Sequence, residues 1–370
     1  MRVLVAPDKF AGTLTAVEVA AAIADGWRRA APNDEIVQVP IADGGPGFVD
    51  VLHVALGGEL LAVTVRGPLG SPVPATLLLV DHTAYVESAQ ACGLALLPSA
   101  STRSSSGVEQ ASTYGVGELV AVAVDAGARR VVVGLGGSGT NDAGAGLLAA
   151  LGATSEPAGA LTAGVDGLAE LRSVDLEPAR RRLTGAVLVA ASDVDNPLLG
   201  LRGATNVFGP QKGIAAERLI EVDGALSRFA HLAGRAPADT PGAGAAGGLG
   251  YALLLLGARR VAGFATVADA LGIADAVRAA DLVLTGEGRL DWQSMSGKVV
   301  SGVAALAGQA MRPCVVLAGD VQIGSRELRA NGIESAYSVI DVVGTAAAFG
   351  DPAESLATVA ARVARTWSRR

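Results

Sequence analysis

Acidic residues follow apolar, strand-like runs at several places in this chain. Asp43 ends the apolar part of "QVPIADGGPGF" (38–48), where a turn alone would explain the glycines and the proline but not the carboxylate. Asp193, Asp195 and Asn196 follow the apolar run in "AVLVAASDVDNP". Two carboxylates and an amide can hold a magnesium ion through water, and one aspartate can accept the proton of an attacking hydroxyl. An Asx-turn before the proline would use the same residues, so both interpretations stay open.

The segment "TGEGRLDWQSMSGK" (285–298) mixes acids and bases within a short span. Its ionisable residues are Glu287, Arg289, Asp291 and Lys298. Such a mixture suits a clamp for a metal ion and phosphate groups, with Asp291, like Asp195, as a candidate metal ligand. A solvated loop would have a similar composition.

Lysine is rare in this chain. Of 29 basic residues only three are lysines, Lys9, Lys212 and Lys298. A strong preference for arginine leaves lysine mainly where a planar guanidinium cannot replace a compact ammonium. All three stand in motif-like segments, "APDKF", "FGPQKG" and "SMSGK", which favours a functional role; chance retention is the alternative.

The glycine-rich segment "GLGGSGTND" (134–142) follows a strand-like run and precedes a helix-like one. Its glycines let backbone N–H groups and the helix N-terminus face an anion, which predicts a phosphate site. The segment also contains the GxGxxG dinucleotide fingerprint, but no acidic residue ends a second strand at the distance a ribose contact needs. Alternatively, Asn141 and Asp142 cap the helix.

The sequence lacks the residue patterns that several other functional classes require. The histidines, His53, His82 and His231, are isolated from these loops, so neither a Ser-His-Asp hydrolase nor a His-ligated zinc site is expected. Two distant cysteines give no disulfide framework and suggest free thiols in the cytoplasm. A net charge of −7 argues against a nucleic-acid partner, and neither a signal peptide nor a membrane span is expected. Phosphoryl transfer remains, with carboxylates for magnesium and lysines and backbone N–H groups for phosphate.

Strand-like and helix-like segments alternate at both ends of the chain, which is the pattern of parallel α/β architecture. Strands are expected at 2–6, 35–41, 281–285, 314–319 and 336–340, and helices at 15–30, 297–310 and 352–367. The five strands make a doubly wound, flavodoxin- or Rossmann-like parallel sheet if both ends of the chain combine. Polar loops at the carboxyl ends of such strands are where these sheets bind ligands.

The middle of the chain has a different pattern of apolar and turn residues. Alternation with Gly-Pro breaks over 60–88 predicts antiparallel hairpins, followed by strands at 130–135 and 186–192. Helices are expected at 108–126, after Asp142, near 215–233 and at 244–257. We therefore expect a mixed α/β domain (63–280) inserted into a first domain (1–62 and 281–370), with the active-site cleft between them.

Long segments of the chain resemble, in order, the motifs of the bacterial glycerate kinase family, the two-domain type unrelated to P-loop or GHMP kinases. They are "APDKFAGTLTA", "IADGG", "TYGVGEL", "GLGGSGTNDAGAG", "DVDNPLLG", "RGAT", "FGPQKG", "PGAGAAGGLG" and "DLVLTGEGRLD" with "SGK". The resemblance extends from residue 2 to about 345 and is more specific for the family than for the substrate.

The resemblance implies transfer of a phosphoryl group from ATP, with magnesium, to D-glycerate, usually giving 2-phosphoglycerate. Among the residues that match the family motifs, we expect the catalytic ones to be Asp193 as the base, Lys9 or Lys212 as the cation at the transferred group, and Asp43. Contacts with substrate and nucleotide are expected from Asp8, Gly136, Gly137, Ser138, Thr140, Asn141, Asp142, Asn196, Gln211, Glu287, Arg289 and Lys298.

Three positions depart from the family pattern. Ala11 stands where the family commonly has a second lysine, and Pro46 and Phe48 replace a glutamate and a threonine or serine. A kinase of a related small hydroxyacid, and a catalytically weak nucleotide- or acid-binding protein, therefore stay as alternatives, with a nicotinamide dehydrogenase more distant. The sequence leaves open which hydroxyl is phosphorylated and the oligomeric state, a homodimer included.

Overall fold

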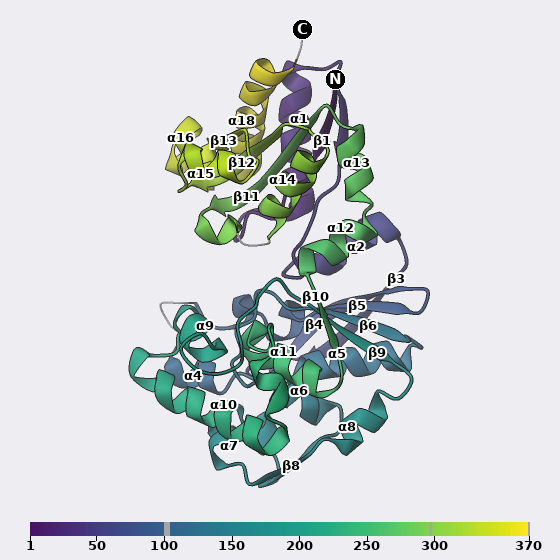
Figure 1. The fold of residues 1–370 in the computed structure, drawn as a ribbon, viewed down its shortest axis with the longest axis vertical. Helices are drawn as coiled ribbons and strands as arrows, with labels where there is room; N and C mark the ends of the chain where they lie inside the picture. Colours follow the sequence, from purple (N-terminus) through teal and green to yellow (C-terminus); the bar gives the residue numbers. More distant parts are fainter. Residues whose placement is uncertain (100–103, 296–297, 369–370) are drawn as a thin grey trace. The chain divides into compact units, whose positions relative to one another are not determined.

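A computed structural model, which describes residues 1–99, 104–295 and 298–368, divides the chain into two compact units. Unit 1 consists of Met1–Asp43, Asp50–Leu56 and Gly263–Arg370. Unit 2 consists of Gly44–Val49 and Gly57–Ala262. Each unit has its own sheet flanked by helices, which confirms the α/β class (Figure 1). The domain boundaries expected near residues 62 and 280 stay predictions.

The sheet of unit 1 has five parallel strands in the order β13-β12-β11-β1-β2. They are β1 (Arg2–Val5), β2 (Glu35–Gln38), β11 (Leu282–Leu290), β12 (Cys314–Val321) and β13 (Ser335–Ser338). These are the five strands predicted from both ends of the chain. The apolar, β-branched runs of β1, β11 and β12 suit a parallel sheet that is buried on both faces.

Two long helices, α1 (Ala16–Ala30) and α18 (Pro352–Trp367), pack side by side against this sheet, as the purple and yellow helices of Figure 1 show. A capping box between Thr15 and Glu18 starts α1, and Trp27 of α1 is fully buried. Val3 and Val5 of β1 belong to the same core cluster as these helices. The other helices of this part are α2 (Phe48–Leu56), α12 (Gly263–Ala270), α13 (Ile273–Ala279), α14 (Val299–Gln309), α15 (Ser325–Ala330), α16 (Val339–Val343) and α17 (Thr345–Gly350).

Several predicted limits of strands in unit 1 were wrong, including that of the strand expected over 35–41, which ends at Gln38. Glu287 and Arg289, expected in a loop, lie within β11, because parallel pairing with β12 continues as far as Leu290. The strand expected at 336–340 ends at Ser338, whose hydroxyl accepts a hydrogen bond from the Asp341 N–H and so starts α16. The expected first residue of the helix over 297–310 lies outside the described residues.

The sheet of unit 2 is mixed, with the order β10-β9-β6-β5-β4-β3. Neighbours from β5 to β10 pair in parallel, whereas β3, β4 and β5 form the antiparallel hairpins predicted over 60–88. The strands are β3 (Glu59–Arg66), β4 (Pro72–Val80), β5 (Thr83–Glu87), β6 (Arg130–Gly134), β9 (Val187–Ala191) and β10 (Arg259–Val261). A separate antiparallel pair, β7 (Thr154–Glu156) and β8 (Ser173–Asp175), was not expected.

The helix predicted over 108–126 is two helices, α4 (Ser105–Glu109) and α5 (Tyr114–Asp125). The break occurs because the backbone N–H and the hydroxyl of Thr113 both donate to Asp142. The other helices are α3 (Ala89–Cys92), α6 (Ala145–Ala150), α7 (Gly164–Glu170), α8 (Glu177–Arg182), α9 (Ala204–Lys212), α10 (Leu219–Ala233) and α11 (Ala245–Leu255). Within the described ranges, no helix has the length and apolar character needed to cross a membrane.

Candidate active site

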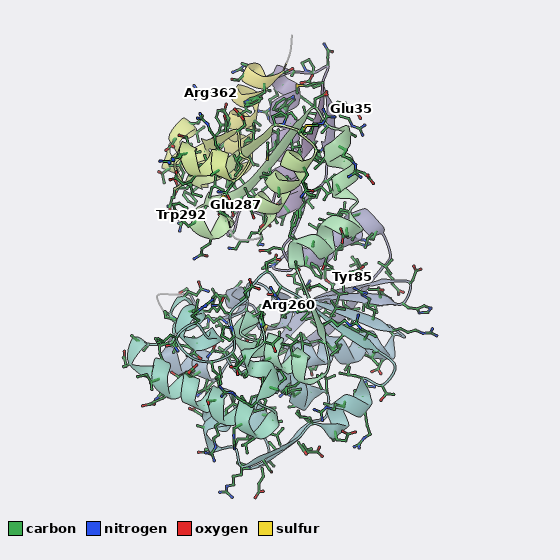
Figure 2. The ribbon with its side chains drawn as sticks, viewed as in Figure 1. Glu35, Tyr85, Arg260, Glu287, Trp292 and Arg362 are labelled. Carbon is green, nitrogen blue, oxygen red and sulfur yellow. The ribbon has the colours of Figure 1, made fainter. Side chains whose placement is uncertain are left out.

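Unit 1 contains a cavity of about 510 Å³ at the carboxyl ends of β1, β11 and β12. All seven of the predicted site residues that belong to unit 1 line it: Asp8, Lys9, Asp43, Glu287, Arg289, Asp291 and Lys298. Figure 2 shows Glu287 and Trp292 at the same end of unit 1, with Glu35 and Arg362 at the opposite end. The polar strand-end motifs of this unit therefore line one cavity at the carboxyl ends of its strands.

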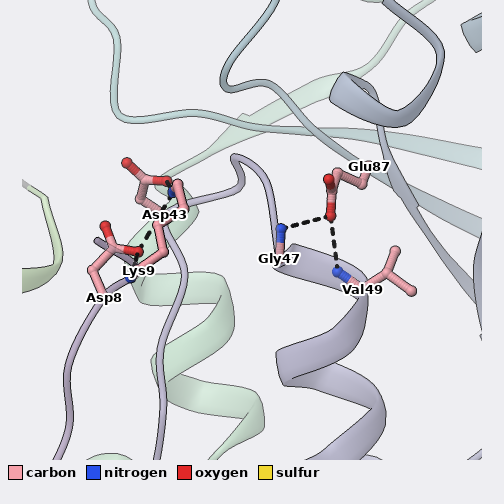
Figure 3. Close-up of polar contacts among 6 residues, drawn as sticks. All are labelled: Asp8, Lys9, Asp43, Gly47, Val49 and Glu87. Atoms are coloured by element: carbon pink, nitrogen blue, oxygen red, sulfur yellow. Dashed lines mark hydrogen bonds and ion pairs between the residues drawn. The ribbon is translucent and has the colours of Figure 1, made fainter. Parts of the chain in front are cut away.

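Lys9 lies between two carboxylates. Its Nζ is 3.5 Å from Asp8 Oδ1 and 3.8 Å from Asp43 Oδ1 (Figure 3). The loop is held in place by the Asp8 N–H, which donates to the Gly286 carbonyl at 2.8 Å, and by the Lys9 N–H, which donates to Asp8 Oδ1. Asp43 is thus more than a turn residue, because its carboxylate faces an ammonium group in the cavity.

Two carboxyl groups of the cavity are held with raised pKa values. Burial raises the pKa of Asp8 to about 6, against the charge of Lys9. Burial likewise raises the pKa of Glu287 to about 7, with a hydrogen bond from Ser294 opposing the shift and the charge of Asp8 adding to it. Glu287 Oε1 is buried and has no hydrogen-bond partner among the described residues. Both carboxylates would gain from a cation that entered the cavity.

Glycines form part of the cavity wall because neighbouring strands approach closely there. A Cβ atom on Gly286 would lie 2.1 Å from the Leu317 carbonyl oxygen, and one on Gly319 would lie 2.4 Å from that of Gly288. Gly288 and Gly319 both line the cavity, as does Ala11, where the family commonly has a lysine. Asp320 of β12, which was not among the expected site residues, lines the cavity too.

In unit 2, the glycines of the 134–142 segment pack against the loop that begins at Gly44. A Cβ atom on Gly136 would lie 2.5 Å from Gly45 Cα, and one on Gly137 would lie 2.8 Å from the Pro46 ring. Gly44 itself has φ +90°. The close approach of these two backbone segments is therefore sufficient to require glycine at positions 136 and 137, without contact to a ligand.

Glu87, which the sequence analysis missed, supports the same loop. The residue is 5% exposed, and its carboxylate accepts hydrogen bonds from the Gly47 N–H at 3.0 Å and the Val49 N–H at 3.4 Å (Figure 3). It therefore caps the start of α2. Phe48 is fully buried and packs edge-on against Tyr85, with ring centroids 6.1 Å apart. The only sequence signal for Glu87 was its place at the end of a strand.

Asp142 caps a helix, as the alternative interpretation had it. Its carboxylate accepts the Thr113 N–H at 2.8 Å, the Gly144 N–H at 3.0 Å and the Gly146 N–H at 3.2 Å. This carboxylate therefore occupies the N-terminus of α6, and the phosphate site expected over 134–142 stays a prediction. Thr140 and Asn141 are also fully buried, and only Gly136 and Gly137 of the segment are appreciably exposed.

Lys212 is buried at the end of α9. Its side chain is 3% exposed, and Nζ donates to the Ser138 hydroxyl at 3.0 Å and to the Thr140 carbonyl at 2.7 Å. Burial lowers the pKa of Lys212 to about 8, and nearby Cys92 and Asp142 oppose that shift. These contacts hold the glycine-rich segment in shape, while Gln211 beside it is exposed.

The segment after β9 has its polar groups engaged locally. Asp195 is 76% exposed and forms an ion pair with Arg260, with 2.7 Å between Oδ1 and Nη2. The Asn196 amide donates to the Arg202 carbonyl at 2.8 Å, so it stabilises the loop. Asp193 is half-buried. Across residues 1–99, 104–295 and 298–368, no three or more His, Cys, Asp or Glu side chains form a group that could hold a metal ion.

Comparisons with known proteins agree on one family. The model of the "Glycerate kinase family" matches residues 3–368. The glycerate kinase of Bacillus subtilis (strain 168) is 40% identical over 92% of this chain and 90% of its own length, and the glycerate 2-kinase of Escherichia coli (strain K12) is 39% identical over 93% and 92%. A crystal structure described as a glycerate kinase 2 from Salmonella typhimurium LT2 covers 99% of this chain and 98% of its own, with a TM-score of 0.78 and 38% identity. The chain therefore belongs to the glycerate kinase family.

Proposed function

We propose that the chain transfers the terminal phosphoryl group of ATP to D-glycerate and gives 2-phosphoglycerate. Family membership supports the reaction class, and a relative named glycerate 2-kinase supports the position of transfer. The observation that carries the proposal is the cavity of unit 1, which combines three cations with buried carboxylates. Such a combination suits phosphoryl transfer, in which positioning and charge stabilisation supply most of the catalysis.

The proposed roles follow from the contacts of each residue. Lys9 and Lys298 neutralise phosphate oxygens in the cavity, and Asp43 orients Lys9. Asp193 accepts the proton of the attacking hydroxyl. Lys212 is a positioning residue in this scheme, because its ammonium group is already bonded to Ser138 and Thr140.

Magnesium fits the carboxylates of the cavity better than those of unit 2. Glu287 has a buried oxygen with no partner among the described residues, and the Asp291 charge adds to the raised pKa of Glu287. Magnesium commonly takes only one or two protein carboxylates and completes its shell with water and phosphate oxygens. Glu287 and Asp291 would hold the ion, and the bound ion would offset phosphate charge. Asp195, the other ligand expected from the sequence, is paired with Arg260 instead.

The test is turnover of purified protein with ATP, magnesium and D-glycerate, with the product identified by phosphorus NMR. A signal from 2-phosphoglycerate is expected. A signal from 3-phosphoglycerate would overturn the position of transfer, and no turnover with any small hydroxyacid would overturn the activity. ATP binding without turnover would favour the alternative of a catalytically weak binding protein.

The role of Asp193 has its own test. Asp193→Asn is expected to lower kcat by at least about 100-fold if this carboxylate is the base. The matched control is Asp239→Asn, an exposed aspartate of the same unit, which should leave kcat within about twofold. A loss of less than about threefold in Asp193→Asn would move the base elsewhere.

The same proposal includes a cytoplasmic enzyme that acts on small molecules. Cys92 and Cys314 are free and buried, as is usual in a reducing compartment. A homodimer stays a prediction.

A further inference from the structure

The cavity of unit 1 has an apolar wall that the proposed reaction leaves without a function. Its cations are Lys9 from the loop after β1, Arg289 from β11 and Lys298 from the start of α14. Five apolar lining residues come from the helices near the C-terminus: Val339 and Ile340 from α16, Ala348 and Phe349 from α17, and Pro352 from α18. We call these five residues the apolar wall.

D-Glycerate does not account for this wall. It is a three-carbon acid whose carbons, apart from their hydrogens, carry only hydroxyl and carboxylate oxygens, so it has almost no apolar surface to bury. The cavity volume of about 510 Å³ falls within the roughly 300–1,000 Å³ typical of sites for much larger ligands. A ligand that fills the cavity therefore has an apolar part as well as an anionic part.

Phe349 is the main feature of the wall. It lies in α17 and is 64% exposed, although large apolar side chains at a pocket usually gain from being covered. The helix is held in place, because the Asp351 N–H and the Ser355 hydroxyl both donate to the Ala347 carbonyl, at 3.1 and 3.0 Å. In Figure 1, α16 and α18 lie beside β12 and β13, and all these contacts are within unit 1. An anchored, exposed ring of this kind suits stacking with a planar ligand.

We propose that the apolar wall binds the base of the nucleotide that donates the phosphoryl group, with Phe349 against the ring and the phosphates directed to Lys9 and Lys298. This inference rests on the proposed kinase activity and adds the subsite for the nucleoside. A nucleotide has the required composition, with a planar apolar end and an anionic end. Stacking tolerates any base, so the wall provides affinity for the ring and not a choice between adenine and guanine.

Phe349→Ala tests the proposal by steady-state kinetics. The KM for ATP is expected to rise by about tenfold, because stacking of one base contributes about this much to affinity. The KM for D-glycerate and kcat should stay within about twofold, and Phe349→Trp should restore the KM for ATP. Met311→Ala is the matched control, since Met311 is 90% exposed in the same unit and does not line the cavity. An unchanged KM for ATP, or a larger change in the KM for D-glycerate, would overturn the proposal.

Calorimetry separates this proposal from the proposed function. Wild-type protein should bind ATP and tripolyphosphate, and Phe349→Ala should weaken ATP binding by about tenfold while tripolyphosphate binding stays the same. This measurement needs no turnover, so it judges the subsite even if the assay with D-glycerate fails. Equal weakening of both ligands, or of neither, would exclude a base on the apolar wall.

Discussion

Replacement of Glu287 by glutamine tests the electrostatics of the cavity most directly. The buried carboxyl group has a pKa of about 7, against 4.5 for an unperturbed glutamate. Between these two values the folded chain holds a proton that the unfolded chain has released. The free energy of unfolding therefore falls as the pH rises through this range, and the penalty is constant above it.

The magnitude follows from the two pKa values. A full shift from 4.5 to about 7 corresponds to about 3.4 kcal/mol, and the part between pH 5 and pH 8 is about 2.5 kcal/mol. Glutamine has nearly the same shape and does not ionise. The stability of Glu287→Gln relative to the wild type should therefore increase by about 2.5 kcal/mol between pH 5 and pH 8.

The assay is urea unfolding followed by tryptophan fluorescence, without nucleotide or metal. All three tryptophans, Trp27, Trp292 and Trp367, belong to unit 1, which contains Glu287. Trp27 is fully buried in the core of that unit, so its emission follows the unfolding of the right part of the chain. Two-state behaviour should be checked first by a second probe.

The control is Glu334→Gln, which removes an exposed carboxylate from the same unit. It should show no such difference between pH 5 and pH 8. If Glu287→Gln and the wild type have the same pH dependence, then the carboxyl group of Glu287 is ionised and solvated in the folded chain. That result would remove the basis for the proposal that Glu287 Oε1 binds a cation.

Two further predictions concern unit 2. Gly136→Ala should lower the free energy of unfolding by about 1–3 kcal/mol in calorimetry, because its Cβ would lie 2.5 Å from Gly45 Cα. The control Gly224→Ala has open space around its Cβ and should be neutral or stabilising. Equal effects of the two variants would contradict the close packing of the Gly136 and Gly45 backbones. For Lys212, the folded pKa of about 8 lies below the unfolded value of 10.5, so the folded chain binds fewer protons between these values and stability rises with pH. Wild-type protein should gain about 2 kcal/mol from pH 8 to pH 10 relative to Lys212→Met, and parallel curves would show that Lys212 is not buried as a cation.

The sequence predicted the sheet of unit 1 because its strands are short, apolar and bounded by turn residues. The parallel direction of these strands was also predictable, since alternating strands and helices favour a parallel sheet. The continuation of β11 through Glu287 to Leu290 was not, because it depends on pairing with β12, about 30 residues further on. A polar, glycine-bearing composition predicts a loop wherever tertiary pairing does not override it.

The site residues also differ in whether a local sequence pattern or a tertiary contact determines their position. Those of unit 1 were predicted together, because carboxyl ends of parallel strands meet at one edge of a sheet. In "GTND", by contrast, Thr140, Asn141 and Asp142 are buried by partners that no local pattern reveals. Asp142 takes hydrogen bonds from Thr113, and Asn141 donates to Thr205, 64 residues away. Spacing shows which residue types are close in the chain, but not which of them point into the core.

The three departures from the family pattern are unequal in consequence. Phe48 is fully buried against Tyr85, and the Pro46 ring lies against Gly137, so apolar packing takes the place of the hydroxyl and the carboxylate there. Ala11, by contrast, lines the cavity of unit 1 beside Lys9. The chain division also falls between Asp43, whose carboxylate faces that cavity, and Gly44, which packs in unit 2. Within "IADGGPGF", Asp43 is thus the residue that lines the cavity, whereas the residues after it pack within unit 2. Of the three departures, Ala11 is therefore the one expected to alter ligand binding.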